Sequence, residues 1–282
     1  MTVVAACQLG PTLREPVANQ ERVAAAVAEA AGRGAELVVL PELMSSGYAF
    51  VDHREAWEWA EPADGPTMRT WAQLAADHEI VLVGGFCERA GERLFNSAAI
   101  VDSSGLRAVY RKAHLWDRER LIFAAGDAAP PIVDTSVGRI STMICYDLEF
   151  PEWVRIPALT GAQLLAAPVA WPALGRPVAG ERPAEVVRVQ ADAGMNRLPV
   201  VACDRVREER GVGWVGGTVL TDADGAVLAG GWGSEREEIM VADVDLSVAD
   251  DKRVGGLSDI HADRRVDLYP TAGWVGLQET GA

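Results

Sequence analysis

Short hydrophobic runs alternate with amphipathic segments along most of the chain, a pattern typical of an α/β protein. The apolar runs predict β-strands at 3–7, 37–40, 80–86, 140–145, 164–167 and 200–204. Apolar residues at helical spacing predict helices at 19–32, over Met68–Ala75, at 152–160 and at 185–196. We therefore expect helices that pack on the faces of a sheet.

Two turn signals indicate that the sheet is mixed rather than fully parallel. Strand-like runs flank "DSSG" at 102–105, and "TDADG" at 221–225 is a second turn signal late in the chain. We therefore expect hairpins at 98–111 and 217–229, which only antiparallel neighbours can form.

The chain shows no low-complexity linker, so we expect a single domain over residues 1–282. The segment 171–183 is rich in Pro and Gly, which predicts a surface loop that forms a lid or a pocket wall. After about residue 250 the periodicity fades, and we expect an extended tail that lies on a partner subunit.

Composition and charge exclude several classes of protein. The net charge of −15 argues against nucleic acid as a partner, because phosphate binding requires a basic face. No apolar run approaches the roughly 20 residues of a membrane span, and "MTVVAACQLG" is expected to be a strand rather than a secretory signal. Four widely spaced cysteines form neither a disulfide framework nor a metal motif, so we expect a cytoplasmic protein without metal or organic cofactor.

Lysine is rare in this chain. Of 26 basic residues only Lys112 and Lys252 are lysine, so arginine serves almost everywhere that a surface cation is needed. Lysine offers a compact point charge on a flexible stem, whereas arginine offers a wide planar fork. A lysine at position 112 therefore indicates a site that a guanidinium would not suit.

Three chemically capable residues share one local setting, directly after a buried apolar strand. Glu42 follows "LVVLP", Lys112 follows "AVYR", and Cys145 ends "ISTMI". Strand ends of α/β sheets and the loops after them are where ligands bind. An acid, a lysine and a cysteine in matching positions form a candidate catalytic set.

Three stretches around these residues carry a family resemblance: "LPELMSSGY" (40–48), "YRKAHLWDRE" (110–119) and "ICYDLEFPE" (144–152). In this order they resemble the nitrilase superfamily of carbon–nitrogen hydrolases. Supporting matches are Gln8, Asn19, "NSAAIVDSSG" (96–105) and "DLY" near the C-terminus. The resemblance implies a four-layer αββα sandwich that commonly forms a homodimer through its outer helices.

The resemblance also implies roles for four residues. Glu42 is expected to be the general base and acid, Lys112 the stabiliser of the anion, and Cys145 the nucleophile. Glu119 is expected to orient Lys112 and the substrate amino group. The chemistry is consistent, because a thiol needs a base or a nearby cation to become a thiolate. The backbone N–H of Tyr146 and Lys112 are the expected donors to the oxyanion.

Other residues have weaker functional signals. Tyr48, Trp116, Tyr146, Phe150 and Trp171 are candidate pocket walls, and each is equally compatible with a core position. Arg176 is the candidate for holding a substrate carboxylate. Structural residues are expected at Cys7, Cys87 and Cys203, which lie in strand-like runs, and at His114, which is expected to be a hydrogen-bonding residue rather than a catalytic one.

The residues after the nucleophile favour one carbon–nitrogen bond. Nitrilases proper usually have Cys-Trp-Glu, whereas Cys145-Tyr146-Asp147 is closer to the amidase branches of the superfamily. The preferred function is therefore hydrolysis of a small carboxamide to acid and ammonia through a thioester. The alternatives are an N-carbamoyl amino acid or β-ureido acid amidohydrolase, a nitrilase, a Cys–His hydrolase that uses His114 or His261, and a non-catalytic binding protein on the same fold.

Overall fold

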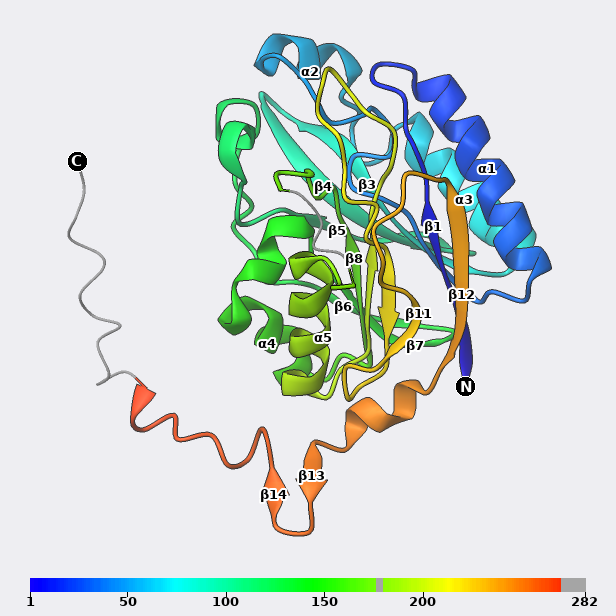
Figure 1. Cartoon of the computed structure of the whole chain (residues 1–282). Helices are drawn as coiled ribbons and strands as arrows, with labels where there is room; N and C mark the ends of the chain where they lie inside the picture. The colour runs from blue at the N-terminus through cyan, green and yellow to red at the C-terminus, as the bar shows by residue number, and fades with distance from the viewer. Residues whose placement is uncertain (176–179, 270–282) are drawn as a thin grey trace, which may run out of the picture.

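The computed structural model describes residues 1–175 and 180–269, and its centre consists of two six-stranded β-sheets. Figure 1 shows the sheets packed face to face with helices on both outer sides. The first sheet has the order β12-β1-β2-β3-β4-β5 and the second the order β11-β10-β9-β8-β7-β6. This is the αββα sandwich that the resemblance implies.

The first sheet contains β1 (Thr2–Gln8), β2 (Leu37–Val39), β3 (Val81–Ala90), β4 (Arg93–Asp102), β5 (Gly105–Arg111) and β12 (Glu238–Val244). The second contains β6 (Ile132–Thr135), β7 (Gly138–Thr142), β8 (Leu164–Pro168), β9 (Val200–Cys203), β10 (Val219–Thr221) and β11 (Val227–Gly230). Each sheet has parallel strands at its centre and antiparallel strands at its edges. The predictions of a mixed sheet and of both hairpins are therefore confirmed.

The outer layers consist of four α-helices. They are α1 (Pro16–Gly32) and α3 (Pro66–His78) on the first sheet, with α4 (Pro151–Leu159) and α5 (Ala184–Asn196) on the second (Figure 1). The short helix α2 (His53–Trp59) and the 3-10 helices η1 (Asp117–Leu121), η2 (Cys145–Glu149) and η3 (Leu246–Asp250) lie in connections.

Successive side chains of each central strand point to opposite faces of its sheet, and this explains how the layers pack together. In β1, Val4 and Ala6 belong to the core between the two sheets, whereas Ala5 and Cys7 belong to the core beneath α1 and α3. Successive side chains of a strand point to opposite faces, so a strand covered on both faces is apolar throughout. This requirement explains the continuous hydrophobic runs in the sequence.

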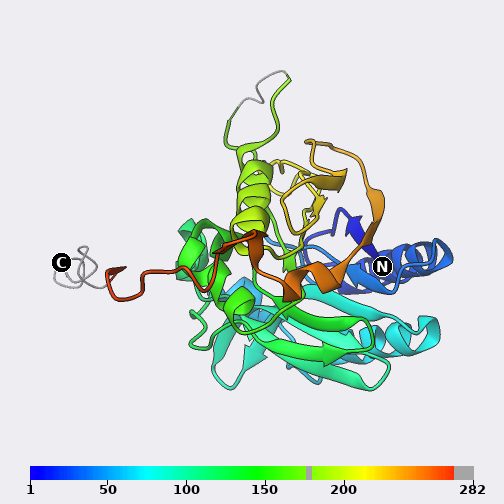
Figure 2. The ribbon, with the colours of Figure 1, turned by 90° about the horizontal axis from the view of Figure 1, so that it is seen from below.

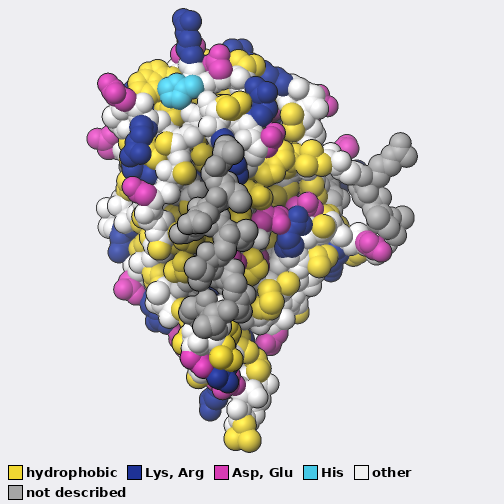
Figure 3. Space-filling model, turned by 90° about the vertical axis from the view of Figure 1, so that its left-hand side faces the viewer, with side chains coloured by type: hydrophobic (Ala, Val, Ile, Leu, Met, Phe, Trp, Pro, Cys, Tyr) yellow, Lys and Arg dark blue, Asp and Glu magenta, His cyan; other side chains and the backbone are white. Residues whose placement is uncertain are grey.

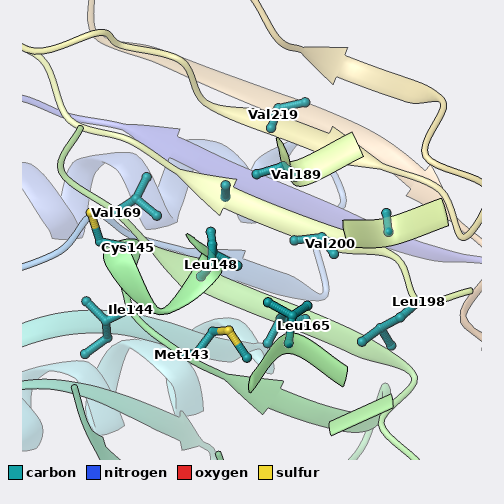
Figure 4. Close-up of a cluster of buried hydrophobic side chains, with 14 of the residues drawn as sticks. Met143, Ile144, Cys145, Leu148, Leu165, Val169, Val189, Leu198, Val200 and Val219 are labelled. Carbon is teal, nitrogen blue, oxygen red and sulfur yellow. The ribbon is translucent and has the colours of Figure 1, made fainter. Parts of the chain in front are cut away.

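A third core lies between the second sheet and the helices α4 and α5. Figure 4 shows part of this cluster, with Cys145 at one end of it and Leu198 at the other. The nucleophile candidate is therefore supported by packed apolar side chains and only 6% of its surface is exposed. Such packing holds a reactive side chain in one position.

Several predicted boundaries differ from the structure, and β3 continues to Ala90 although the strand was expected to end at residue 86. The first helix begins at Pro16 rather than Asn19, because proline suits the first turn of a helix, where its missing N–H is not needed. The predicted strand 140–145 ends at Thr142, since the Ile144 N–H donates to the side chain of Asp147 (3.0 Å) instead of to a strand. The elements α2, β6 and β12 were not predicted.

The C-terminal segment leaves the sandwich after η3. It forms a hairpin of β13 (Arg253–Gly255) and β14 (Ser258–Asp259) that projects from the body in Figure 1 and is seen end-on in Figure 2, where the molecule is viewed from below. No helix in the described part of the chain is long and apolar enough to cross a membrane.

Candidate active site

Three connections bring the predicted residues to one place between the sheets. Glu42 follows β2, Lys112 follows β5, and Cys145 begins η2 after β7. The Glu42 N–H donates to the Val169 carbonyl (3.3 Å), which ties the loop after β2 to the loop after β8 in the other sheet. The site is therefore built across the sheet–sheet interface.

A glycine allows the Glu42 turn to lie against the neighbouring strand. A Cβ on Gly85 in β3 would lie 2.5 Å from the Leu43 nitrogen and 2.6 Å from the Glu42 Cα. Real Cβ atoms do not approach backbone so closely, so a larger residue would displace the turn that carries Glu42.

Lys112 is the centre of the polar cluster. Its ammonium group is fully buried, and Nζ donates to Glu42 Oε1 (2.7 Å) and to Glu119 Oε1 (2.8 Å). An irregular stretch, residues 113–116, leads from Lys112 to η1, and this 3-10 helix carries Glu119. An ammonium group has three donors, so one remains for a substrate.

Asn96 joins the two carboxylates from the other side. Its Nδ2 donates to Glu42 Oε1 (2.6 Å) and to Glu119 Oε1 (3.1 Å), and its backbone carbonyl accepts from the Lys112 N–H (2.9 Å). In the sequence Asn96 stands out only as the first residue of the supporting match at 96–105. A buried asparagine within the apolar strand β4 is the signal that identifies it, since asparagine is depleted in strands and buried polar groups need partners.

One oxygen of Glu42 remains free for chemistry. Oε2 is buried and has no hydrogen-bond partner among the described residues. Burial raises the pKa of Glu42 to about 7, although Lys112 beside it acts in the opposite direction. Two carboxylates share one ammonium, so a proton is readily held on Glu42. This side chain can therefore both take and give a proton near neutral pH.

Cys145 has a strained backbone and a buried thiol. Its φ is +47°, in the left-handed region that favours glycine, and its Sγ lies 3.7 Å from the Ala170 carbonyl oxygen. Burial raises the pKa of the Cys145 thiol well above its usual range; the charge of Glu42 acts in the same direction and that of Lys112 lowers it. The resting residue is therefore a thiol, and attack requires removal of its proton.

Asp147 fixes the connection that carries Cys145 to the one that carries Lys112. Its fully buried carboxylate accepts from the Ile144 N–H (3.0 Å) and the His114 N–H (3.0 Å). It also contacts His114 Nδ1 (2.7 Å) and accepts from the Tyr110 hydroxyl (2.8 Å). Both His114 and Asp147 therefore have structural partners close to the site.

A cavity of about 240 Å³ opens beside this cluster. Its walls include Trp116, Tyr146 and Trp171, three of the predicted pocket residues, and Tyr146 directly follows Cys145. The other lining residues are Glu149, Pro172, Leu174, Glu185 and Arg188. The cavity suits a small ligand with an apolar part and a polar end.

The remaining predicted residues have other positions. Tyr48 donates its hydroxyl to Glu119 Oε1 (2.7 Å), and Phe150 stacks on His114 with 3.9 Å between ring centroids; neither is among the residues that line the cavity. Arg176 lies outside the described residues. Within residues 1–175 and 180–269 no group of three His, Cys, Asp or Glu side chains is placed to hold a metal ion.

Comparison with known proteins identifies the family. The carbon–nitrogen hydrolase family matches residues 3–253. A nitrilase of Pyrococcus abyssi is 35% identical over 95% of this chain and 99% of its own length. An N-carbamoylputrescine amidase of Solanum lycopersicum is 31% identical over 95% of this chain and 94% of its own length.

A solved structure is also similar over the whole fold. The amidase of Nesterenkonia sp. AN1 superposes with a TM-score of 0.78 at 25% identity, covering 96% of this chain and 99% of that one. A glutamate-to-glutamine mutant of that amidase shows Michael addition of acrylamide at its active-site cysteine. The chain belongs to the carbon–nitrogen hydrolase family and, within the nitrilase superfamily, to its amidase-like branch, whose members hydrolyse carbon–nitrogen bonds other than peptide bonds.

Proposed function

We propose that this protein hydrolyses a small carboxamide to the carboxylic acid and ammonia through a thioester on Cys145. The observation that carries the proposal is the buried cluster in which Lys112 bridges Glu42 and Glu119, while one oxygen of Glu42 has no hydrogen-bond partner among the described residues. This cluster lies close enough to Cys145 that the charges of Glu42 and Lys112 act on its pKa.

The first half of the reaction forms the thioester. The free oxygen of Glu42 takes the thiol proton of Cys145, and the sulfur attacks the carbonyl carbon of the amide. The carbonyl oxygen then bears the negative charge. Glu42 returns the proton to the amide nitrogen, the carbon–nitrogen bond breaks, and ammonia leaves.

The oxyanion needs donors that are in place before charge develops. The third Nζ proton of Lys112 is one candidate donor, and the backbone N–H of Tyr146 is the other, because the first N–H groups of a helix such as η2 have no partner within it. Removing a donor of this kind costs roughly 3–4 kcal/mol of transition-state stabilisation.

The second half releases the acid. Glu42 takes a proton from water, the resulting hydroxide attacks the thioester carbon, and the carbon–sulfur bond breaks. The thiolate recovers the proton from Glu42. Glu119 and Asn96 hold Glu42 and Lys112 at the required spacing throughout, because their hydrogen bonds converge on the same oxygens.

The test is ammonia release from a panel of acetamide, propionamide, acrylamide, ω-amides, carbamoyl amino acids and nitriles. We expect the highest kcat/KM with a small carboxamide. A nitrile as the best substrate, or no ammonia from any compound, would contradict the proposal.

A carbamoyl amide is the second candidate, and the rim of the cavity favours it. Arg188 Nε donates to both oxygens of Glu149 (2.8 Å each), whereas Glu185 lies 3.8 Å from the same guanidinium. This charged rim suits a substrate with a charged distal group. The relative from Solanum lycopersicum is an N-carbamoylputrescine amidase. A higher kcat/KM for N-carbamoylputrescine than for propionamide would favour this candidate.

We predict that activity falls as the pH drops below about 7. Glu42 must be ionised to accept the thiol proton, and burial raises its pKa to about 7, so kcat/KM should fall tenfold per pH unit on the acid side. Lys112 has a pKa well above its ordinary range because of the two carboxylates, so it should cause no alkaline loss near neutral pH. A kcat/KM that stays constant down to about pH 5 would exclude Glu42 as the base.

We also propose a homodimer formed through the outer face of α4 and α5 and the C-terminal segment. Apolar side chains are exposed there, including Leu159 (42%), Met195 (47%) and Leu257 (100%), and Figure 3 shows hydrophobic side chains spread over this face. Light scattering should give twice the mass of one chain. A chain that ends at Asp251 should dissociate more readily, whereas equal stability of both dimers would remove the segment from the interface.

A further inference from the structure

We propose that Glu209, held by Arg205, is a positioning residue that keeps the Tyr48 hydroxyl on Glu119. The inference rests on the proposed function, and it assigns a role in that reaction to a buried ion pair whose hydrogen-bond partners do not include Glu42, Lys112 or Cys145.

Glu209 holds the backbone of the Tyr48 turn. Its Oε2 accepts from the N–H groups of Tyr48 and Ala49, both at 2.9 Å. The approach is close, because a Cβ on Gly47 would lie 2.8 Å from Glu209 Oε1, and the φ of Gly47 is +82°. Two charge-assisted hydrogen bonds to consecutive N–H groups fix the direction in which Tyr48 leaves the turn.

Arg205 fixes Glu209 in turn. Its side chain is fully buried and forms an ion pair with Glu209 Oε1, and its second bond from the same nitrogen goes to the Pro11 carbonyl (3.2 Å). The guanidinium lies over the Trp214 ring at 4.6 Å, and that ring meets the Tyr48 ring edge-on at 5.2 Å. Arg205 and Glu209 therefore support Tyr48 through both its backbone and its ring.

Tyr48 transmits this placement to the reactive cluster. Its hydroxyl donates to Glu119 Oε1, the same oxygen that accepts from Lys112 Nζ. Burial raises the pKa of Tyr48 well above its usual range, so the hydroxyl keeps its proton as a donor. A displaced Tyr48 would leave Glu119 with fewer partners and would let Lys112 shift from its position beside Glu42.

Burying the Arg205–Glu209 ion pair costs hydration free energy, which indicates a role beyond stability. Two charges removed from water lose several kcal/mol each in hydration, and apolar residues of similar volume often replace such a pair without loss of stability. In Glu209, Oε2 accepts hydrogen bonds from the Tyr48 turn, and Oε1 accepts from Arg205. The connection that carries Arg205 and Glu209 also contacts the cavity wall, because its Val215 N–H donates to the Trp171 carbonyl (2.9 Å).

The test compares Glu209→Ala and Glu209→Gln in the full-length protein, each with Tyr48 intact and with Tyr48→Phe, using the best amide of the panel. With Tyr48 intact, Glu209→Ala should lower kcat at least about tenfold and change KM less than about threefold. Glu209→Gln should recover part of the loss, because an amide oxygen still accepts from an N–H. In the Tyr48→Phe background, Glu209→Ala should cost less than about twofold.

Glu61→Ala is the matched control. Glu61 also accepts two hydrogen bonds, from the N–H (2.8 Å) and hydroxyl (2.9 Å) of Thr67 at the start of α3, and we expect its loss to change kcat less than about twofold. A folded Glu209→Ala variant that matches this control, or that loses the same factor with and without the Tyr48 hydroxyl, would overturn the inference.

A wild-type protein without amidase activity would count against the proposed function instead. In that case the rate at which iodoacetamide alkylates Cys145 tests whether Glu209 is a positioning residue, because that rate depends on the placement of Lys112. We expect Glu209→Ala to slow alkylation at least about threefold with Tyr48 intact and to have no effect with Tyr48→Phe. An unchanged rate with Tyr48 intact would overturn the inference by this second route.

Discussion

Cys145→Ala should abolish ammonia release, with a loss of at least about 10,000-fold in kcat. No other described thiol can replace it, since Cys7, Cys87 and Cys203 are fully buried in strands and burial raises the pKa of each. The expected loss is large because every covalent step passes through this sulfur. The measurement is ammonia release at saturating amide, with far-UV circular dichroism to show that the variant is folded.

A covalent probe distinguishes a nucleophile from a residue that merely supports the fold. Iodoacetamide should add one carbamoylmethyl group to the wild-type protein with loss of iodide, located at Cys145 by peptide mass spectrometry, and none at this position in Cys145→Ala. Cys7→Ala is the control, because its thiol is fully buried in β1; it should keep near wild-type kcat and still be labelled. Appreciable turnover by Cys145→Ala would refute the thioester mechanism.

The central strands of both sheets and the helices α1, α3, α4 and α5 were predictable because their sequences carry a strong hydrophobic pattern. β1, β2, β8 and β9 are apolar on both faces, and α3 and α5 present an apolar stripe to a sheet. The pairing of β12 with β1 was not predictable from local patterns, because the two strands are distant in sequence and β12 is partly exposed. The second sheet likewise acquires its edge strand β6 from a short segment without strong alternation.

The reactive cluster was predictable only through motifs. Local sequence placed Glu42, Lys112 and Cys145 after strands, but the distances between them depend on how two sheets pack. Asn96 and Glu209 could not be found by spacing, since Asn96 contacts Glu42 and Glu209 contacts the Tyr48 turn, and these segments meet only in the folded chain. A buried polar residue inside an apolar strand is the signal for a position such as Asn96, whereas Arg205 and Glu209 lie in the connection after β9.

The Tyr146-Asp147 pair has a more limited meaning than its sequence context suggests. Asp147 is fully buried, is not among the residues that line the cavity, and uses its carboxylate to fix Ile144 and His114. It therefore cannot read the difference between an amide and a nitrile by contact with the substrate. A discriminating contact from this pair must come from the Tyr146 side chain, which does line the cavity.

Lys112→Arg should lower kcat/KM at least about 100-fold, and Lys112→Met at least about 1,000-fold. The ammonium of Lys112 fits between Glu42 and Glu119 at 2.7 and 2.8 Å with no exposed surface, so a planar guanidinium would push these carboxylates apart and misplace the oxyanion donor. The measurement is kcat/KM with the best amide. Lys252→Arg is the matched control, because the Lys252 ammonium donates to the backbone carbonyls of Asn196 and Arg197 at the end of α5, away from the reactive cluster, and it should leave kcat/KM within about twofold.

Stability against pH separates the charge of Lys112 from its shape. Without the ammonium, Lys112→Met leaves two buried carboxylates uncompensated, and the pKa of Glu42 rises further above its unfolded value. A carboxyl with a raised folded-state pKa contributes stability below its unfolded pKa and loses it as the pH rises through the folded value. Lys112→Met should therefore lose about 3–5 kcal/mol near pH 8 and much less near pH 5. An equal drop in Tm at both values would mean that the lysine acts by packing alone, since only a charge effect depends on the protonation of its partners.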